Sequence, residues 1–294
     1  YYTQHLPTRE HTTMTNYATV NNIQLAYDEH GSGNTTLLLM HGLTANLRSF
    51  DGLLKAGLAE NYHVIRVDLR GRGHSDKPQI GYHMKDHAAD IIGLLDALNL
   101  ETVTLVGHSF GGLLAMYMAG QFADRLNKIV VIDAGLEATK EAVVEKIRPS
   151  LERLKLPIAD KEAALNVMRN APYFADGSWN EEIEAWYRSE IVATEEGAYK
   201  RLVYPDGISQ AIDHILADDW EAYLRTVKVP ALLIHAPAPF GTPDMPPILS
   251  IEGAQETVSL VPNMQYQQVS GHHITMIFGD YAQNVVNAIK NFVG

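Results

Sequence analysis

The sequence predicts an α/β fold in which a mostly parallel, eight-stranded sheet carries helices on both faces and a helical cap is inserted near the middle of the chain. Short apolar runs alternate with segments of helical periodicity, which is typical of a parallel sheet. The runs are rich in Val, Ile and Leu, as expected for strands that are buried on both faces. With 294 residues, 46% of them hydrophobic, the chain is long enough to bury a large core.

The eight expected strands follow in chain order. Residues 17–31 predict two strands joined at Asn21 and Asn22, a pair that indicates a hairpin. Five further apolar runs, at 35–42, 62–71, 102–109, 126–135 and 229–236, are too short for buried helices and predict strands. The segment MQYQQVSG, at 264–271, predicts the last strand.

Helical patterns lie between these strands. Apolar residues recur at helical spacing in 83–99, residues 110–122 are apolar nearly all round, and 282–292 suits a closing helix. Residues 136–228 are charged and helical without a convincing strand, which predicts a cap inserted into a core made of 17–135 and 229–294.

The termini and the composition of the chain indicate which binding partners and which cellular location to expect. The chain starts with Tyr and Met14 is a candidate natural start, so residues 1–16 are expected to be a tail that is flexible or added to the natural chain. A net charge of −12 argues against binding to nucleic acid or to anionic membrane surfaces. The sequence has neither a signal-peptide pattern nor an apolar run of about 18 residues, so we expect a cytoplasmic protein.

Metal and thiol chemistry are not expected. The chain has no cysteine, which excludes disulfides, thiolate catalysis and cysteine-ligated zinc. His83 and His87 have the i,i+4 spacing of metal ligands, but the sequence offers no evident third ligand. We therefore expect neither a metal nor a cofactor.

The sequence GHSFG, residues 107–111, matches the pattern G-x-S-x-G in the context that gives this pattern its meaning. A buried strand precedes it and a helix follows, so Ser109 is expected on a strained strand-to-helix turn, where Gly107 and Gly111 leave room. The positive end of the following helix would point at the serine. Ser109 is therefore the expected nucleophile, with His108 packed beside it; an ordinary turn is the alternative.

A nucleophilic serine also needs oxyanion donors and a base. The first long apolar strand ends in MHGL, residues 40–43, where Gly42 lets the backbone turn inward and the amide of Leu43 can face a carbonyl. The amide of Phe110 would be the second donor. VSGHHI, at 269–274, follows the last strand, and His272, directly after Gly271, is preferred as the base over His273.

At this point the chain resembles an α/β-hydrolase of the single-cap type across residues 17–294. MHGL, VDLRGRGHSD (67–76), GHSFGG and SGHH occur in that family's order and spacing. The resemblance implies a Ser-His-acid triad, no metal, and a lid over the site.

The resemblance also implies where the acid should lie, and here the sequence departs from the family. The usual position, soon after ALLIHA (231–236), reads PAPF and holds no carboxylate. Asp244 lies 28 residues before His272, which fits the family's spacing and makes Asp244 the preferred acid. Asp133, at the end of KIVVIDAG, is the alternative.

These features predict a serine hydrolase that cleaves small-molecule carboxylic esters or lactones, with Gly42, His108, Trp186 and Trp220 as candidate substrate contacts. The family's C–C hydrolases commonly carry Asn where His108 stands, which favours ester or lactone cleavage. N-acyl homoserine lactone hydrolysis and C–C bond hydrolysis remain alternatives within enzymes. A ligand receptor with a hydrolase fold is the non-enzymatic alternative, and the sequence does not indicate an oligomeric state.

Overall fold

The computed structural model describes residues 15–294, except for the side chains of Pro149 and Ser150. Its main sheet has eight strands in the order β1-β2-β4-β3-β5-β6-β9-β10. Their bounds are β1 (Asn16–Val20), β2 (Ile23–His30), β3 (Thr36–Met40), β4 (His63–Val67), β5 (Val103–His108), β6 (Leu126–Ile132), β9 (Ala231–His235) and β10 (Met264–Gln268). The predicted tail is outside the described residues up to position 14, and β1 begins one residue before the expected start of the core.

The N-terminal hairpin is antiparallel, and the strands from β4 to β10 are parallel. The turn between β1 and β2 is made by Asn21 and Asn22, which both have positive φ, at 47° and 62°. Two successive left-handed residues match the right-handed twist of the flanking strands, so this pair closes the hairpin tightly. The predicted mostly parallel, eight-stranded sheet is thus confirmed.

Both faces of the sheet are buried, as the apolar strands require. Along β3, Leu38 and Met40 belong to one hydrophobic cluster, whereas Leu37 and Leu39 belong to a second cluster on the opposite face. The side chains of a strand alternate between faces, so one short run supplies both cores.

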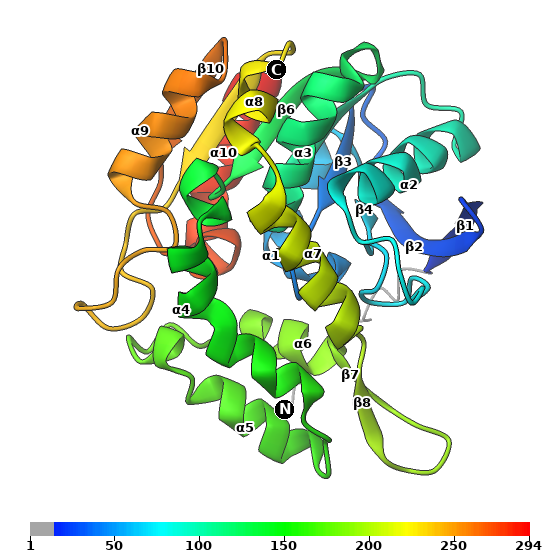
Figure 1. The fold of residues 1–294 in the computed structure, drawn as a ribbon, viewed down its shortest axis with the longest axis vertical. Coiled ribbons are helices and arrows are strands. Elements are labelled where there is room, and N and C mark those ends of the chain that lie inside the picture. The colour runs from blue at the N-terminus through cyan, green and yellow to red at the C-terminus, as the bar shows by residue number, and fades with distance from the viewer. Residues whose placement is uncertain (1–14) are drawn as a thin grey trace, which may run out of the picture.

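Each face is covered by its own helices (Figure 1). Residues of α2 (Met84–Ala97), α3 (Phe110–Gln121), α8 (Trp220–Arg225) and α9 (Ile251–Leu260) pack in the first cluster. Residues of α1 (Asp51–Lys55) and α10 (Gly279–Val293) pack in the second. The expected helices at 83–99, 110–122 and 282–292 correspond to α2, α3 and α10.

The segment between β6 and β9 contains the helices that were expected as a cap. They are α4 (Glu141–Glu152), α5 (Lys161–Arg169), α6 (Glu181–Ser189) and α7 (Pro205–Ala217), and Figure 1 draws α5 and α6 at one end of the molecule. The expectation that this segment has no strand is wrong. β7 (Ile191–Ala193) and β8 (Tyr199–Arg201) pair as a small antiparallel hairpin, because the β-branched residues at 191–192 follow the end of α6.

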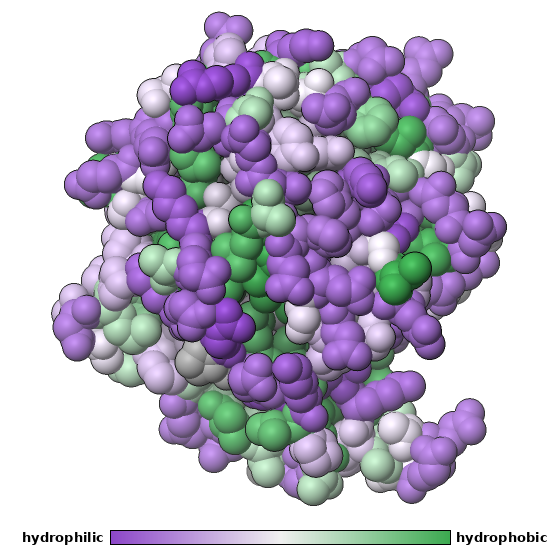
Figure 2. All heavy atoms as spheres, viewed as in Figure 1, coloured by the Kyte–Doolittle hydropathy of each residue, from purple (hydrophilic) through white to green (hydrophobic). Residues whose placement is uncertain are grey.

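The view in Figure 2 shows a mainly hydrophilic surface, with hydrophobic surface exposed between α4 and α7 and over the helices at the lower end. Among residues 15–294, no helix combines the length and the apolar character needed to cross a bilayer.

Candidate active site

Ser109 lies on a strained turn between β5 and α3. Its φ of 54° and ψ of −117° are unfavourable for a residue with a side chain, and its amide donates to the carbonyl of Ile132 on the neighbouring strand. A Cβ at Gly107 would lie 2.0 Å from the Gly111 carbonyl oxygen, and a Cβ at Gly111 would lie 1.9 Å from the Met40 carbonyl oxygen. Only glycine fits at either position, so the local sequence enforces the sharp turn that exposes the serine.

The loop after β3 passes beside this serine. A Cβ at Gly42 would lie 3.6 Å from the Cβ of Ser109, so the backbone of the loop faces this serine. Among the described residues, neither the amide of Leu43 nor that of Phe110 donates to a protein acceptor. Phe110 is also the first residue of α3, where the amide groups of a helix lack partners within the helix. These two N–H groups are therefore available for an oxyanion.

Two buried side chains fix the carbonyl groups of the loop. His41 accepts from the amide of Leu69 at Nε2 (3.0 Å) and donates from Nδ1 to the carbonyl of Gly42 (2.8 Å). Burial lowers the pKa of His41 to about 3, so its ring stays neutral and keeps this donor arrangement. Arg72 donates from Nε to the Leu43 carbonyl at 2.9 Å. With the Gly42 carbonyl held, the peptide plane that carries the N–H of Leu43 cannot rotate freely.

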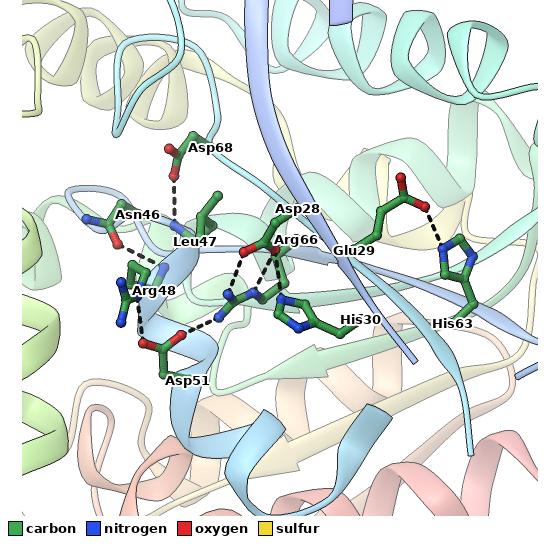
Figure 3. Close-up of polar contacts among 10 residues, drawn as sticks. All are labelled: Asp28, Glu29, His30, Asn46, Leu47, Arg48, Asp51, His63, Arg66 and Asp68. Atoms are coloured by element: carbon green, nitrogen blue, oxygen red, sulfur yellow. Dashed lines mark hydrogen bonds and ion pairs between the residues drawn. The ribbon is translucent and has the colours of Figure 1, made fainter. Parts of the chain in front are cut away.

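A buried carboxylate holds the far end of the same loop (Figure 3). Asp68 accepts from the amides of Leu47 and His74, each at 2.8 Å, and Asn46 accepts from the amide of Arg48 to cap the short 3₁₀ helix that follows. Burial raises the pKa of Asp68, against the opposing effect of these hydrogen bonds. Asp68 thus ties the strand end of β4 to the loop beside Ser109.

A histidine and a carboxylate meet at the edge of the sheet next to the serine. Nδ1 of His273 lies 2.6 Å from Oδ2 of Asp133, and Asp133 is 1% exposed. Asp133 directly follows β6, whose last residue pairs with His108 at the end of β5. The other oxygen of Asp133 accepts from the amide of Ala236 at 3.0 Å. Neighbouring parallel strands therefore bring the acid and the serine to one edge.

His272, the preferred base, does not hold that position. Its amide donates to Thr275 Oγ1 at 2.9 Å, and its Nδ1 accepts from the amide of Ile274 at 3.2 Å. Its Nε2 lies 3.8 Å from Asp176, which is too far for a hydrogen bond. Burial lowers the pKa of His272 to about 4. The ring lines neither cavity next to Ser109, so the expected Ser109–His272 pairing is wrong in geometry.

Asp244, the preferred acid, is also misplaced. It lies on an exposed loop, and its hydrogen bonds to Thr242 and to its own backbone lower its pKa. The expected contact between Asp244 and a catalytic imidazole is therefore wrong, and the alternative, Asp133, makes the contact with His273 instead. The signal for Asp133 was in the sequence, as an acidic residue directly after the apolar run 126–132.

Two adjoining cavities, of about 130 and 110 Å³, meet at the serine. Both are lined by Leu43, Ser109 and His273. Three of the expected substrate contacts, Gly42, His108 and Trp186, line the larger of these two cavities. His108 donates from Nε2 to the carbonyl of His273 at 2.8 Å, and burial lowers its pKa to about 3.

Trp220 is not part of either cavity. It is 3% exposed, packs in the cluster on the α3 face, and donates from Nε1 to the carbonyl of Ile215 at 2.8 Å. Its expected role as a substrate contact is wrong, because α8 packs against α3 rather than over the serine. Trp220 is instead a core residue.

The buried neutral histidines give the protein a strong expected pH dependence of stability. Burial lowers the pKa of His41 and His108 to about 3 and of His272 to about 4, and lowers that of His87 well below its usual value. In the unfolded chain each takes up a proton near pH 6.5. Between that pH and the folded pKa values the unfolded state binds more protons, so acidification destabilises the fold. Glu190 acts oppositely, since burial raises its pKa to about 7.

We expect the free energy of unfolding to fall by about 3 kcal/mol between pH 6.5 and 5.5, as four histidines outweigh one glutamate. Urea unfolding at a series of fixed pH values measures this free energy. His87→Leu should reduce the pH dependence of the free energy of unfolding by the uptake of up to one proton. It removes no hydrogen bond with the described part of the chain, where neither ring nitrogen of His87 has a hydrogen-bond partner. If the free energy of unfolding is constant from pH 7 to pH 5, these histidines are not buried as neutral imidazoles.

Comparison with known proteins identifies relatives over most of the chain. The family model described as the alpha/beta hydrolase fold matches residues 35–280. A 2-(acetamidomethylene)succinate hydrolase of Mesorhizobium japonicum is 39% identical over 114 residues, which are 39% of this chain and 40% of that protein. The chain thus spans about two fifths of the length of this relative and of an uncharacterised Mycobacterium tuberculosis protein that is 34% identical over 149 residues.

Solved structures resemble the whole fold. The crystal structure of an E-2-(acetamidomethylene)succinate hydrolase superposes with a TM-score of 0.81 at 24% identity, covering 96% of this chain and 99% of that one. The enol-lactonase of Burkholderia xenovorans LB400 superposes with a TM-score of 0.73 at 22% identity, covering 95% and 99%. At these identities the likeness establishes the fold.

Proposed function

Because this chain belongs to the α/β-hydrolase fold family, we propose that it is a serine hydrolase that cleaves carboxylic esters or lactones. In this proposal Ser109 is the nucleophile, His273 the base and Asp133 the acid that orients the base. The amides of Leu43 and Phe110 form the oxyanion hole.

One observation carries the proposal. His273 bonds to a buried carboxylate at 2.6 Å and lines the same two cavities as Ser109. A nucleophile, a base and a third group that orients the base are the parts that activated-serine chemistry needs. The strained turn adds support, since such strain persists where the surrounding structure enforces it and clusters at functional sites.

The chemistry follows from these roles. Ser109 Oγ attacks the ester carbonyl while His273 takes its proton at Nε2, and the negative charge moves onto the carbonyl oxygen. The amides of Leu43 and Phe110 stabilise that oxyanion. His273 then protonates the leaving alkoxide, which leaves an acyl group on Ser109. Water, deprotonated by the same imidazole, releases the acid and restores the serine. Asp133 accepts the Nδ1–H throughout, which fixes the tautomer and stabilises the imidazolium.

The size of the two cavities favours small substrates. Their volumes of about 130 and 110 Å³ suit short acyl or alkyl groups, and their walls are largely apolar. An ester or lactone is favoured over a C–C bond by His108 before the nucleophile, and the enol-lactonase among similar folds is a lactone hydrolase by name.

Labelling with a fluorophosphonate tests the proposal directly. We expect one covalent adduct per chain, mapped to Ser109 by peptide mass spectrometry, because the reagent traps an activated serine. Ser109→Ala should not be labelled. Ser209→Ala, which removes a serine hydroxyl on the outer side of α7, is the matched control and should be labelled like the wild type. An unlabelled wild type contradicts the enzyme proposal and favours the ligand receptor.

A further inference from the structure

The two cavities at Ser109 differ in chemical character. They share Leu43, Ser109, Ile147, Phe240 and His273, and therefore join around the nucleophile. The smaller one continues between α4 and α7 among aliphatic side chains, including Val143, Val144, Ile212 and Ile215. We name it the aliphatic chamber. The larger one continues toward Arg153, Trp186 and Tyr187, and we name it the aromatic chamber.

The aromatic chamber contains two buried donors that have no acceptor. Nε of Arg153 and Nε1 of Trp186 are both inaccessible to solvent and make no hydrogen bond with a described residue. Trp186 is 7% exposed as a whole side chain. Both groups can only donate. Leaving a buried donor unsatisfied is costly, so two of them in one chamber indicate an acceptor supplied by a ligand.

The charge of Arg153 is not neutralised by an ion pair with any described residue. Glu190, which is 8% exposed, interacts electrostatically with Arg153 and also with Arg201. Burial raises the pKa of Glu190 to about 7, so near neutral pH this carboxyl group is partly protonated and cancels the positive charge only in part. The guanidinium also lies over the ring of Tyr187, 6.0 Å from its centroid, which holds it at the wall of the chamber.

We propose that the substrate carries a free carboxylate, bound in the aromatic chamber by Arg153 and Trp186, and an aliphatic group that lies in the aliphatic chamber, with the ester bond between them at Ser109. This inference rests on the proposed function for the position of the ester bond. A carboxylate fits better than a phosphate, because its two oxygens match the fork of a single guanidinium and the cavity is small.

The binding test uses the inactive variant Ser109→Ala, so that turnover plays no part. The probes are the monomethyl and dimethyl esters of succinate, glutarate and adipate, titrated by calorimetry. At least one monoester should bind about tenfold or more tightly than its neutral diester, since hydrogen bonds to charged groups contribute at this level. Equal binding of every monoester and its diester overturns the proposal.

Three variants and one control in the Ser109→Ala background show which side chains cause the preference. Arg153→Gln should abolish the preference for the monoester, whereas Arg153→Lys should keep part of it. Trp186→Phe keeps the ring and should weaken monoester binding a few-fold without affecting the diester. Arg148→Gln, which removes an exposed arginine on α4, the helix that ends just before Arg153, should change nothing. An unchanged preference in Arg153→Gln also overturns the proposal, and thermal unfolding checks that each variant folds.

Hydrolysis of the same esters by the enzyme with Ser109 intact separates this inference from the proposed function. If both ester forms are hydrolysed with equal kcat/KM and Arg153→Gln keeps that ratio, the carboxylate subsite is wrong while the hydrolase stands. If no ester is hydrolysed but the Ser109→Ala protein binds monoesters through Arg153, the carboxylate subsite stands and the proposed function is wrong.

Discussion

Replacing His273 with alanine should lower kcat for an activated ester by roughly 10⁶-fold, because a serine without its base is not an effective nucleophile. His273 is the histidine that lines the cavities with Ser109 and contacts Asp133. The rate of hydrolysis of p-nitrophenyl acetate or butyrate, and the rate of fluorophosphonate labelling, measure the loss.

His272→Gln is the matched control for this prediction. Glutamine can still accept the amide of Ile274, as Nδ1 of His272 does, so the turn keeps its hydrogen bond. Activity should stay within about tenfold of the wild type, because His272 lines neither cavity at Ser109. If His272→Gln is inactive and His273→Ala is active, the base is His272 and our assignment is reversed.

The Asp133→Asn variant should lose about 10⁴-fold in kcat while keeping the fold. The asparagine oxygen can still accept from the amide of Ala236, as Oδ1 of Asp133 does. Its amide group would then face Nδ1 of His273 and donate to it. The imidazole would carry its proton on Nε2 and could not accept one from Ser109.

Asp244→Asn provides the contrast, since its side chain lies on an exposed loop with Thr242 as its partner. Its kcat should equal that of the wild type. Urea unfolding distinguishes a lost proton acceptor from a lost fold in Asp133→Asn. An Asp133→Asn enzyme with full activity, together with an inactive Asp244→Asn enzyme, would restore Asp244 as the acid.

The parts of the fold that depend on local chemistry could be predicted from the sequence. The runs rich in Val, Ile and Leu specify the buried central strands, because such a run in a polar chain is stable only when buried. Asn21 and Asn22 specify the hairpin through their tolerance of positive φ. Around Ser109, Gly107 and Gly111 specify the turn, because a Cβ at either one would collide with the backbone within a few residues or on the adjacent strand.

The parts that depend on contacts between distant segments could not be predicted. The spacing of 28 residues between Asp244 and His272 describes positions along the chain and does not say which side chains are close in space. The order of the strands in the sheet decides which carboxylate lies beside which imidazole. β6 lies between β5 and β9, and this order sets Asp133 at the edge that also holds Ser109.

Two further choices were made by packing. Adjacent histidines direct their side chains differently, and the hydrogen bonds of His272 to the turn at Ile274 and Thr275 leave His273 to face Asp133. Trp186 and Trp220 are alike in sequence, but α6 directs Trp186 toward the cavity and α8 buries Trp220 against α3. The sequence by itself determined the elements and the strained turn that carries Ser109, since neighbours along the chain decide those. The tertiary structure alone decided which residues lie beside Ser109, since only folding brings residues 109, 133 and 273 together.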